Sequence, residues 1–81
     1  MPRFYFNVHG AEELPDSEGL ELPDLTAVKC CAIKEARSLM SADVLGGEIR
    51  IDRHFQVTDD VGAVMLILPF AEAFAVRGTP M

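Results

Sequence analysis

Cysteine is scarce in this sequence: Cys30 and Cys31 are the only two, and they are neighbours in the chain. Adjacent residues on a helix point about 100° apart, so these two cannot join distant parts of a fold. The sequence therefore excludes a disulfide framework and favours a reducing compartment such as the cytoplasm. We expect both thiols to be structural or incidental, because no histidine lies close to them in the sequence to activate them.

Basic residues are also few. Seven Lys and Arg stand against thirteen Asp and Glu, which gives a formal net charge of −6 and a pI of about 4.6. The basic residues are scattered along the chain, whereas a phosphate-binding surface needs them clustered. Tyr5 lies between two phenylalanines and could stack on bases, but its surroundings are not basic. A nucleic-acid partner is therefore not expected.

Long hydrophobic runs and cofactor motifs are absent too. The most apolar stretch, residues 61–76, contains Pro69 and Glu72 and is shorter than the ~20 residues of a membrane-spanning helix. The amino-terminal residues alternate and include Arg3, unlike a signal peptide. No glycine-rich phosphate loop, dinucleotide fingerprint or nucleophile elbow occurs. We expect a cytoplasmic protein with no cofactor and no membrane association.

Apolar residues are abundant for so short a chain. They make up 49% of the 81 residues, which we interpret as a single domain over residues 1–81 with a partly ordered tail at about 71–81. A domain of this size has little interior. Some of its apolar surface must therefore lie outside or meet a partner.

The first half of the chain predicts a strand, a loop, a short strand and a helix. Residues 3–8 alternate between apolar and polar, and Leu20 and Leu22 form the inward pair of a second short strand. Pro23 ends that strand, and Asp24 is a suitable helix N-cap. The expected buried stripe of the helix has one small or apolar residue at each turn, namely Leu25, Val28, Ala32, Ala36 and Leu39, with Met40 at its edge. The glycines at 46 and 47 close the helix.

The second half predicts another hairpin. Residues 49–58 alternate and form one strand, or two short strands broken near Asp52 and Arg53. Residues 59–62 have a turn composition, residues 63–70 form the last strand, and a helical turn through Phe74 follows. The expected fold is α+β, a ββαββ-like antiparallel sheet of about four strands packed on one helix.

The last strand is apolar on both of its sides. One helix covers one face of a sheet, so the second face needs another cover. The candidates are the tail around Phe74 and Val76, or a second copy of the protein. We expect a homodimer, or association with another protein, through the sheet face or edge, and the interface candidates are Tyr5, Met65, Ile67 and Phe74.

Catalytic and metal-binding patterns are weak. His9 and His54 are the only histidines, one on each expected hairpin, and no His-x-x-x-His or Cys-x-x-Cys spacing occurs. We expect no catalytic residue and no metal site; the weak metal candidates are His9, His54 and Asp16. The acidic residues around Asp16 are interpreted as a solvated loop. The favoured function is a small non-enzymatic binding or regulatory module. The alternative is a small metal-dependent protein or enzyme that uses the two histidines and the acidic loop.

Several landmarks together resemble one family. They are the opening MPRFYF, the junction EGLELPD at residues 18–24, the alanine-rich helix, and the hairpin VTD…G at residues 57–62 that leads to Leu68-Pro69-Phe70. In this order they resemble a family of short bacterial proteins catalogued as a domain of unknown function, over about residues 1–72. The chain departs from that family at Asn7 and His9, where similar proteins often have a histidine and an acidic residue. The resemblance implies no activity, cofactor or catalytic residue.

Overall fold

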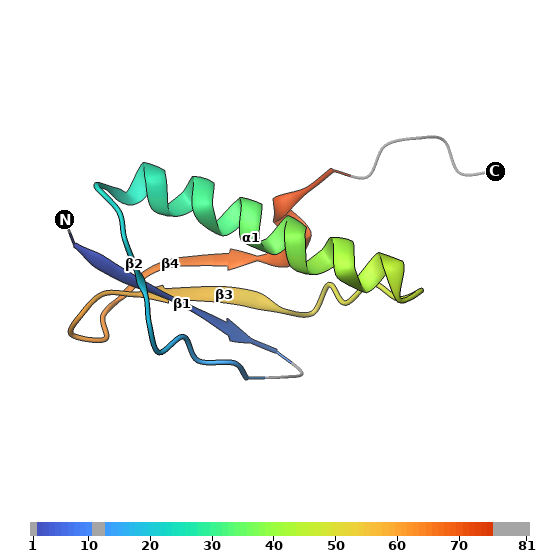
Figure 1. Ribbon diagram of the computed structural model, residues 1–81, viewed down its shortest axis with the longest axis horizontal. Coiled ribbons are helices and arrows are strands. Elements are labelled where there is room, and N and C mark those ends of the chain that lie inside the picture. Colours follow the sequence, from blue (N-terminus) through green and yellow to red (C-terminus); the bar gives the residue numbers. More distant parts are fainter. Residues whose placement is uncertain (1, 11–12, 76–81) are drawn as a thin grey trace.

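The computed structural model describes residues 2–10 and 13–75, which form one helix packed on a four-stranded sheet (Figure 1). The sheet has the order β2-β1-β3-β4, and each neighbouring pair is antiparallel. The elements, in chain order, are β1 (Arg3–His9), β2 (Leu20–Glu21), α1 (Leu25–Leu45), β3 (His54–Thr58), β4 (Val64–Pro69) and the 3₁₀ helix η1 (Phe70–Ala73). The expected α+β fold is confirmed.

The two hairpins join through their inner strands. β1 pairs with β2 over only two positions, Arg3 with Glu21 and Phe4 with Leu20. On its other side β1 pairs with β3 over five positions, from Tyr5 opposite Thr58 to His9 opposite His54. Strands far apart in the sequence therefore lie side by side at the centre of the sheet, and this order decides which polar side chains become neighbours.

The helix begins and ends where the sequence indicates. Asp24 caps it, with Oδ1 accepting a hydrogen bond of 2.8 Å from the backbone N–H of Ala27. After the C-cap Gly46, Gly47 has a φ of 87°, which an L side chain rarely adopts. In the part of the chain that the structure describes, no helix combines the length and hydrophobicity that crossing a membrane requires.

The buried row of the helix differs from the predicted stripe. It consists of one residue in every four, Val28, Ala32, Ala36 and Met40. Leu25 and Leu39 are 48% and 37% exposed. Met40 therefore belongs to the buried row itself, and Leu39 lies beside it. Ala32 and Ala36 have small side chains in the middle of the row, so the helix backbone can lie close to the sheet. At this short distance a narrow row of side chains is sufficient to cover the sheet.

Strands and helix enclose one hydrophobic core. From the sheet it receives alternate residues that face α1, and from η1 it receives Phe70 and Ala73. The Phe55 ring lies 4.9 Å from that of Phe70 and 6.0 Å from that of Phe6, between ring centroids. The strand residues buried in this core are Phe4, Val8, Phe55, Val57 and Leu68.

Residues 48–53 are irregular and contain no strand, so the expectation of a strand from residue 49 was wrong. Ile49 and Ile51 are 51% and 57% exposed, and β3 begins only at His54. The alternation fails at Arg53, which takes the inward position before Phe55 and bonds to Asp43 on α1. A buried guanidinium needs a hydrogen-bonding partner, and the partner of Arg53 lies on α1. The contact draws residues 48–53 toward the helix and away from the hydrogen-bonded strands of the sheet.

The chain turns back onto the helix after β4. Phe70 donates its backbone N–H to the carbonyl of Arg53 at 3.0 Å, and η1 then packs against α1. Arg37 on α1 donates to the carbonyl of Ala73 at 2.6 Å. The helical turn predicted after the last strand is confirmed as η1, whereas residues 76–81 of the tail, including Val76, lie outside the described residues.

Candidate functional site

The face of the sheet opposite α1 is the candidate functional surface. Because side chains alternate along a strand, the residues between the buried positions project from it. We call this the open face; its members on β1, β3 and β4 are Arg3, Tyr5, Asn7, His9, His54, Gln56, Thr58, Met65, Ile67 and Pro69. It is polar over β1 and β3 and apolar over β4, so its two halves suit different chemistry.

His9 and His54 lie side by side on the open face. They are register partners across β1 and β3, their ring centroids are 5.6 Å apart, and their planes differ by 19°. Glu13 Oε2 lies 3.4 Å from His9 Nδ1. The sequence places the two histidines on separate hairpins, and pairing of the inner strands brings them together.

Asp16, the third weak metal candidate, is engaged in the loop beside β1. Its Oδ2 accepts from the N–H of Phe6 at 3.1 Å, and its Oδ1 accepts from the N–H groups of Glu18 and Gly19, each at 3.1 Å. Its own N–H donates to Asn7 Oδ1 at 2.9 Å. The carboxylate thus satisfies a β1 donor that β2 is too short to reach. In residues 2–10 and 13–75, no three His, Cys, Asp or Glu side chains converge as possible metal ligands.

The bonding of Asp16 makes loop stability sensitive to acid. Partial burial raises the pKa of this carboxyl, but the backbone donors Phe6, Gly19 and Glu18 outweigh burial, so the folded pKa lies below the ordinary 3.8. A group with a lowered folded pKa stabilises the fold above its unfolded pKa, and that stability is lost as pH falls through the folded value. We expect Asp16→Asn to cost about 1 kcal/mol at neutral pH and progressively less on acidification toward and below pH 3.8.

Urea denaturation followed by circular dichroism, from pH 7 to about pH 3, measures this difference. Asp60→Asn is the matched control, because Asp60 is exposed in the β3–β4 turn. A constant gap between wild type and Asp16→Asn across the whole pH range would contradict the role of the Asp16 charge.

The apolar half of the open face lies on β4. Met65 is 39% exposed and Ile67 is 55% exposed. Phe74, the expected tail cover, lies instead on the helix side, where it packs against the core and lines a small apolar groove. Phe74 therefore does not cover Met65 and Ile67.

Tyr5 is a less accessible interface candidate than Met65 or Ile67. It is half-buried, and the loop before β2 passes close to its ring. A Cβ on Gly19, which has a φ of 72°, would come within 2.9 Å of Tyr5 Cε2 and 3.0 Å of the Phe4 carbonyl oxygen. Any residue larger than glycine would displace this loop from the sheet.

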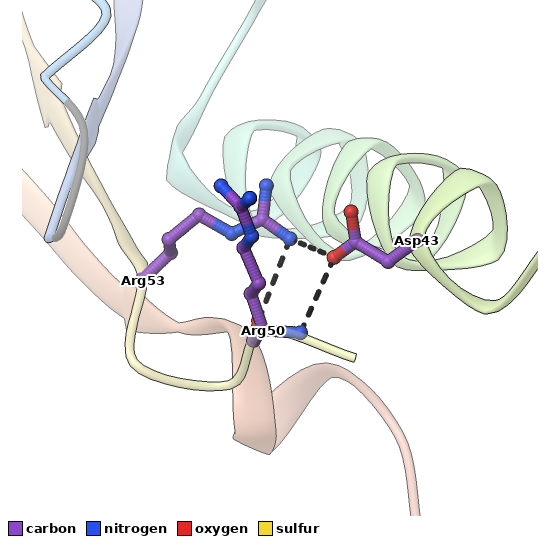
Figure 2. Close-up of polar contacts among 3 residues, drawn as sticks. All are labelled: Asp43, Arg50 and Arg53. Atoms are coloured by element: carbon purple, nitrogen blue, oxygen red, sulfur yellow. Dashed lines mark hydrogen bonds and ion pairs between the residues drawn. The ribbon is translucent and has the colours of Figure 1, made fainter. Parts of the chain in front are cut away.

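An ion pair beneath the helix end is the strongest polar feature that sequence reasoning missed (Figure 2). Asp43 accepts from Arg53 Nη2 and, at 3.4 Å, from the N–H of Arg50, so one carboxylate holds the irregular segment to α1. The side chains of Arg53 and Asp43 are 9% and 19% exposed, and the Arg53 guanidinium carbon lies 4.8 Å from the Phe70 ring centroid. Arg53 Nε is buried without a hydrogen-bond partner. The available signal was an arginine at an apolar position of the alternation.

The Cys31 thiol is not activated. Cys30 is exposed and Cys31 is half-buried, and both are free. Burial raises the pKa of the Cys31 thiol, the carboxylate of Glu35 raises it further, and Lys34 only partly offsets them. A raised pKa disfavours the thiolate, which is the reactive form.

The groove beside Phe74 is small. Its volume is about 150 Å³, below the usual size of a ligand pocket, and its lining residues are Arg37, Met40, Ser41, Val44, Ile49 and Phe74. The Arg37 guanidinium is already bonded to the carbonyl of Ala73. We assign this groove no ligand.

Comparison with known proteins identifies the family. A family model described as "Domain of unknown function (DUF6894)" matches residues 3–71. No curated protein and no solved structure matches the chain significantly. The match covers most of the sequence and places the chain in that family, as the resemblance of its landmarks indicated.

Proposed function

We propose that this chain, a member of the DUF6894 family, is a non-enzymatic binding module that associates through β4 and the open face beside it, and that one partner is a second copy of itself. The observation that carries the proposal is the apolar edge of the sheet. β4 pairs with β3 on one side and is the last strand in the order of the sheet. Val64, Met65 and Ile67 on this strand are 48%, 39% and 55% exposed.

The composition of β4 supports this proposal. Sheet edges of monomeric proteins commonly carry charges, proline or bulges that prevent further pairing. No charged residue lies between Asp60 and Glu72, although the whole chain has a net charge of −6. A register shift between Val57 and Thr58 and the proline at 69 are the only such devices on this hairpin. The stretch between Asp60 and Glu72 is the longest in the sequence without a charged residue, which lowers the charge repulsion between two acidic chains that meet there.

The backbone alternation indicates how a second copy would pair. Phe70 donates to Arg53, and residues two apart face the same neighbour, so Leu68 and Leu66 also face β3. Ile67 and Pro69 then direct their backbone groups outward. In an antiparallel pair centred on Ile67, each copy donates its Ile67 N–H to the Ile67 carbonyl of the other, and Met65 lies opposite Pro69. Proline lacks an N–H, but its carbonyl still accepts a bond.

Association of two copies through the edge strand β4 is more favourable than stacking their open faces on each other. Stacked sheets bury both inner faces, and stacking would bury Asn7, Gln56 and the two histidines without new partners. Pairing at β4 places Ile67 opposite its copy and Met65 opposite Pro69 across the new junction. Such apolar cross-strand pairs contribute about 0.2–1 kcal/mol each.

The proposal places the module in the cytoplasm, which the two free thiols support, since cysteines stay reduced there. A regulatory module of this kind needs no cofactor. Its affinity comes from main-chain hydrogen bonds, and its specificity comes from the alternate side chains of the added strand.

Light scattering across a dilution series tests self-association. We expect the wild-type mass to move from dimer to monomer on dilution, and Ile67→Lys to weaken association by at least about tenfold, or 1.4 kcal/mol. The lysine places a charge at the centre of the edge. Ile51→Lys is the matched control, because Ile51 is 57% exposed but lies outside the sheet; it should leave association unchanged.

Amide hydrogen exchange separates edge pairing from other modes of contact. The Ile67 N–H should exchange more slowly as the protein concentration rises, since pairing gives it a hydrogen-bond partner. A wild-type chain that stays monomeric at every concentration would rule out the second copy as partner. Association without protection of Ile67 would rule out the edge.

A further inference from the structure

The stacked histidines lie at the end of the open face where β1 ends and β3 begins. His9 comes from β1 and His54 from β3, and they are separated by 45 positions in the sequence but paired in the sheet. Their ring centroids are 5.6 Å apart. We propose that these two imidazoles bind one divalent transition-metal ion, of the kind represented by Ni²⁺ and Zn²⁺, as a two-residue clamp across the strands.

The strand register supports the clamp. Directly paired residues of antiparallel strands have Cα atoms about 4.5–5.5 Å apart and side chains on the same face. Both histidines are only partly buried, so their rings can rotate about their side-chain torsions. A shared ion at about 2.0–2.1 Å from each nitrogen requires the two nitrogens to approach to on the order of 3 Å. Rotation of the His54 ring about its side-chain torsions, with the His9 ring held by Glu13, would bring a His54 nitrogen toward Nε2 of His9 without moving the backbone.

Glu13 is an independent observation that points to the same ligand. Its carboxylate lies 3.4 Å from His9 Nδ1, so a proton on Nδ1 would face Glu13 and the lone pair of Nε2 would be available to a metal ion. Metal-binding histidines commonly donate their second ring N–H to a carboxylate, which fixes the ring and strengthens the bond to the metal. Glu13 is therefore assigned as the positioning residue of His9.

The type and the number of the protein ligands define the class of metal ion. Imidazole suits nickel, copper and zinc, whereas calcium and magnesium require several oxygen ligands. Two protein nitrogens leave further coordination positions to water or to another ligand. In the described ranges no third side chain joins them, so we expect weaker and more readily reversible binding than at a site with three or four protein ligands. The clamp lies on β1 and β3 and does not depend on association through β4.

Calorimetric titration of the whole chain with Ni²⁺ tests the clamp. We expect one ion per chain, and affinity at least about tenfold weaker in His9→Gln and in His54→Gln alike, because either change leaves a single imidazole. Glutamine is the substitution of choice, since β3 already carries Gln56 on the same face. Glu13→Gln should weaken binding by about 10–100-fold with both ligands in place. If each histidine variant lost only about half of the affinity, the two imidazoles would bind separately, and the proposal would fail.

Thermal melting gives a second readout. The unfolded chain does not hold residues 9 and 54 together, so Ni²⁺ should raise the melting temperature of the wild type and not of His54→Gln. The titration is repeated with Zn²⁺ on Cys30→Ser/Cys31→Ser, because free thiols also bind zinc. Retained Zn²⁺ binding supports the clamp, whereas binding that disappears with the thiols, or a melting temperature that Ni²⁺ leaves unchanged, overturns it.

Discussion

Replacing Asp43 with alanine is expected to lower the free energy of unfolding by about 3–5 kcal/mol, because it leaves the Arg53 guanidinium buried without its counter-ion. The side chain of Arg53 is 9% exposed, and its Nε already lacks a hydrogen-bond partner. Asp43 also accepts the N–H of Arg50. A domain of this length typically has about 4–12 kcal/mol of total stability, so the variant should be partly unfolded at room temperature. Urea denaturation followed by circular dichroism measures the loss.

Two further variants separate the charge from the rest of the side chain. Asp43→Asn keeps an acceptor without the charge and should lie between wild type and Asp43→Ala. In Asp43→Ala/Arg53→Met no buried charge is left, so the double variant should be more stable than Asp43→Ala. Asp60→Ala is the surface control, with an expected change within about 0.5 kcal/mol. An Asp43→Ala protein as stable as Asp60→Ala would show that the ion pair contributes nothing.

Phe70→Ala is the second large effect, with an expected loss of about 3–5 kcal/mol. The side chain is fully buried at the junction of β4 and η1, where its ring contacts Phe55 and stacks under the Arg53 guanidinium. The substitution therefore removes core volume and also a cation–π contact, which contributes about 0.5–2 kcal/mol. The measurement is again the urea midpoint, with a thermal melt as a second readout.

Phe74→Ala is the matched control for Phe70, because Phe74 is an aromatic residue four positions later that is only half-buried. It should cost clearly less than Phe70→Ala. Phe70→Leu fills most of the space and should also cost less. Since Phe70 and Asp43 both contact Arg53, the losses of Phe70→Ala and Asp43→Ala should not add in a double variant. Equal losses for the two phenylalanines would contradict the central position of Phe70.

Local sequence patterns predicted the secondary-structure elements correctly where the element depends only on residues that are close together in the sequence. Pro23 and Asp24 mark the change from strand to helix, and the cap bond to Ala27 confirms it. The alternation of β1 and the short apolar run of β4 identified these two strands. The prediction failed at Leu39 and Ile51, since how far a side chain is buried depends on how close another element lies.

The residues of the open face also fall into two groups, those that the sequence could identify and those that it could not. Met65 and Ile67 could be identified as exposed apolar residues once one helix had to cover one sheet. The stacking of His9 and His54 could not, because it follows from β1 pairing with β3, and the two hairpin patterns are compatible with other strand orders. The ion pair of Asp43 and Arg53 could not be predicted for a similar reason, since Asp43 lies on α1 and Arg53 lies in the segment before β3.

By itself, the sequence determined the class of fold, the ends of its helix, the lack of a disulfide framework and the acidic net charge. These follow from interactions between near neighbours and from composition. Only the tertiary structure decided which strands lie together, which half of the open face is apolar, and where the buried arginine finds its counter-ion. Such contacts join residues distant in the chain, and their energies depend on a geometry that local patterns do not contain.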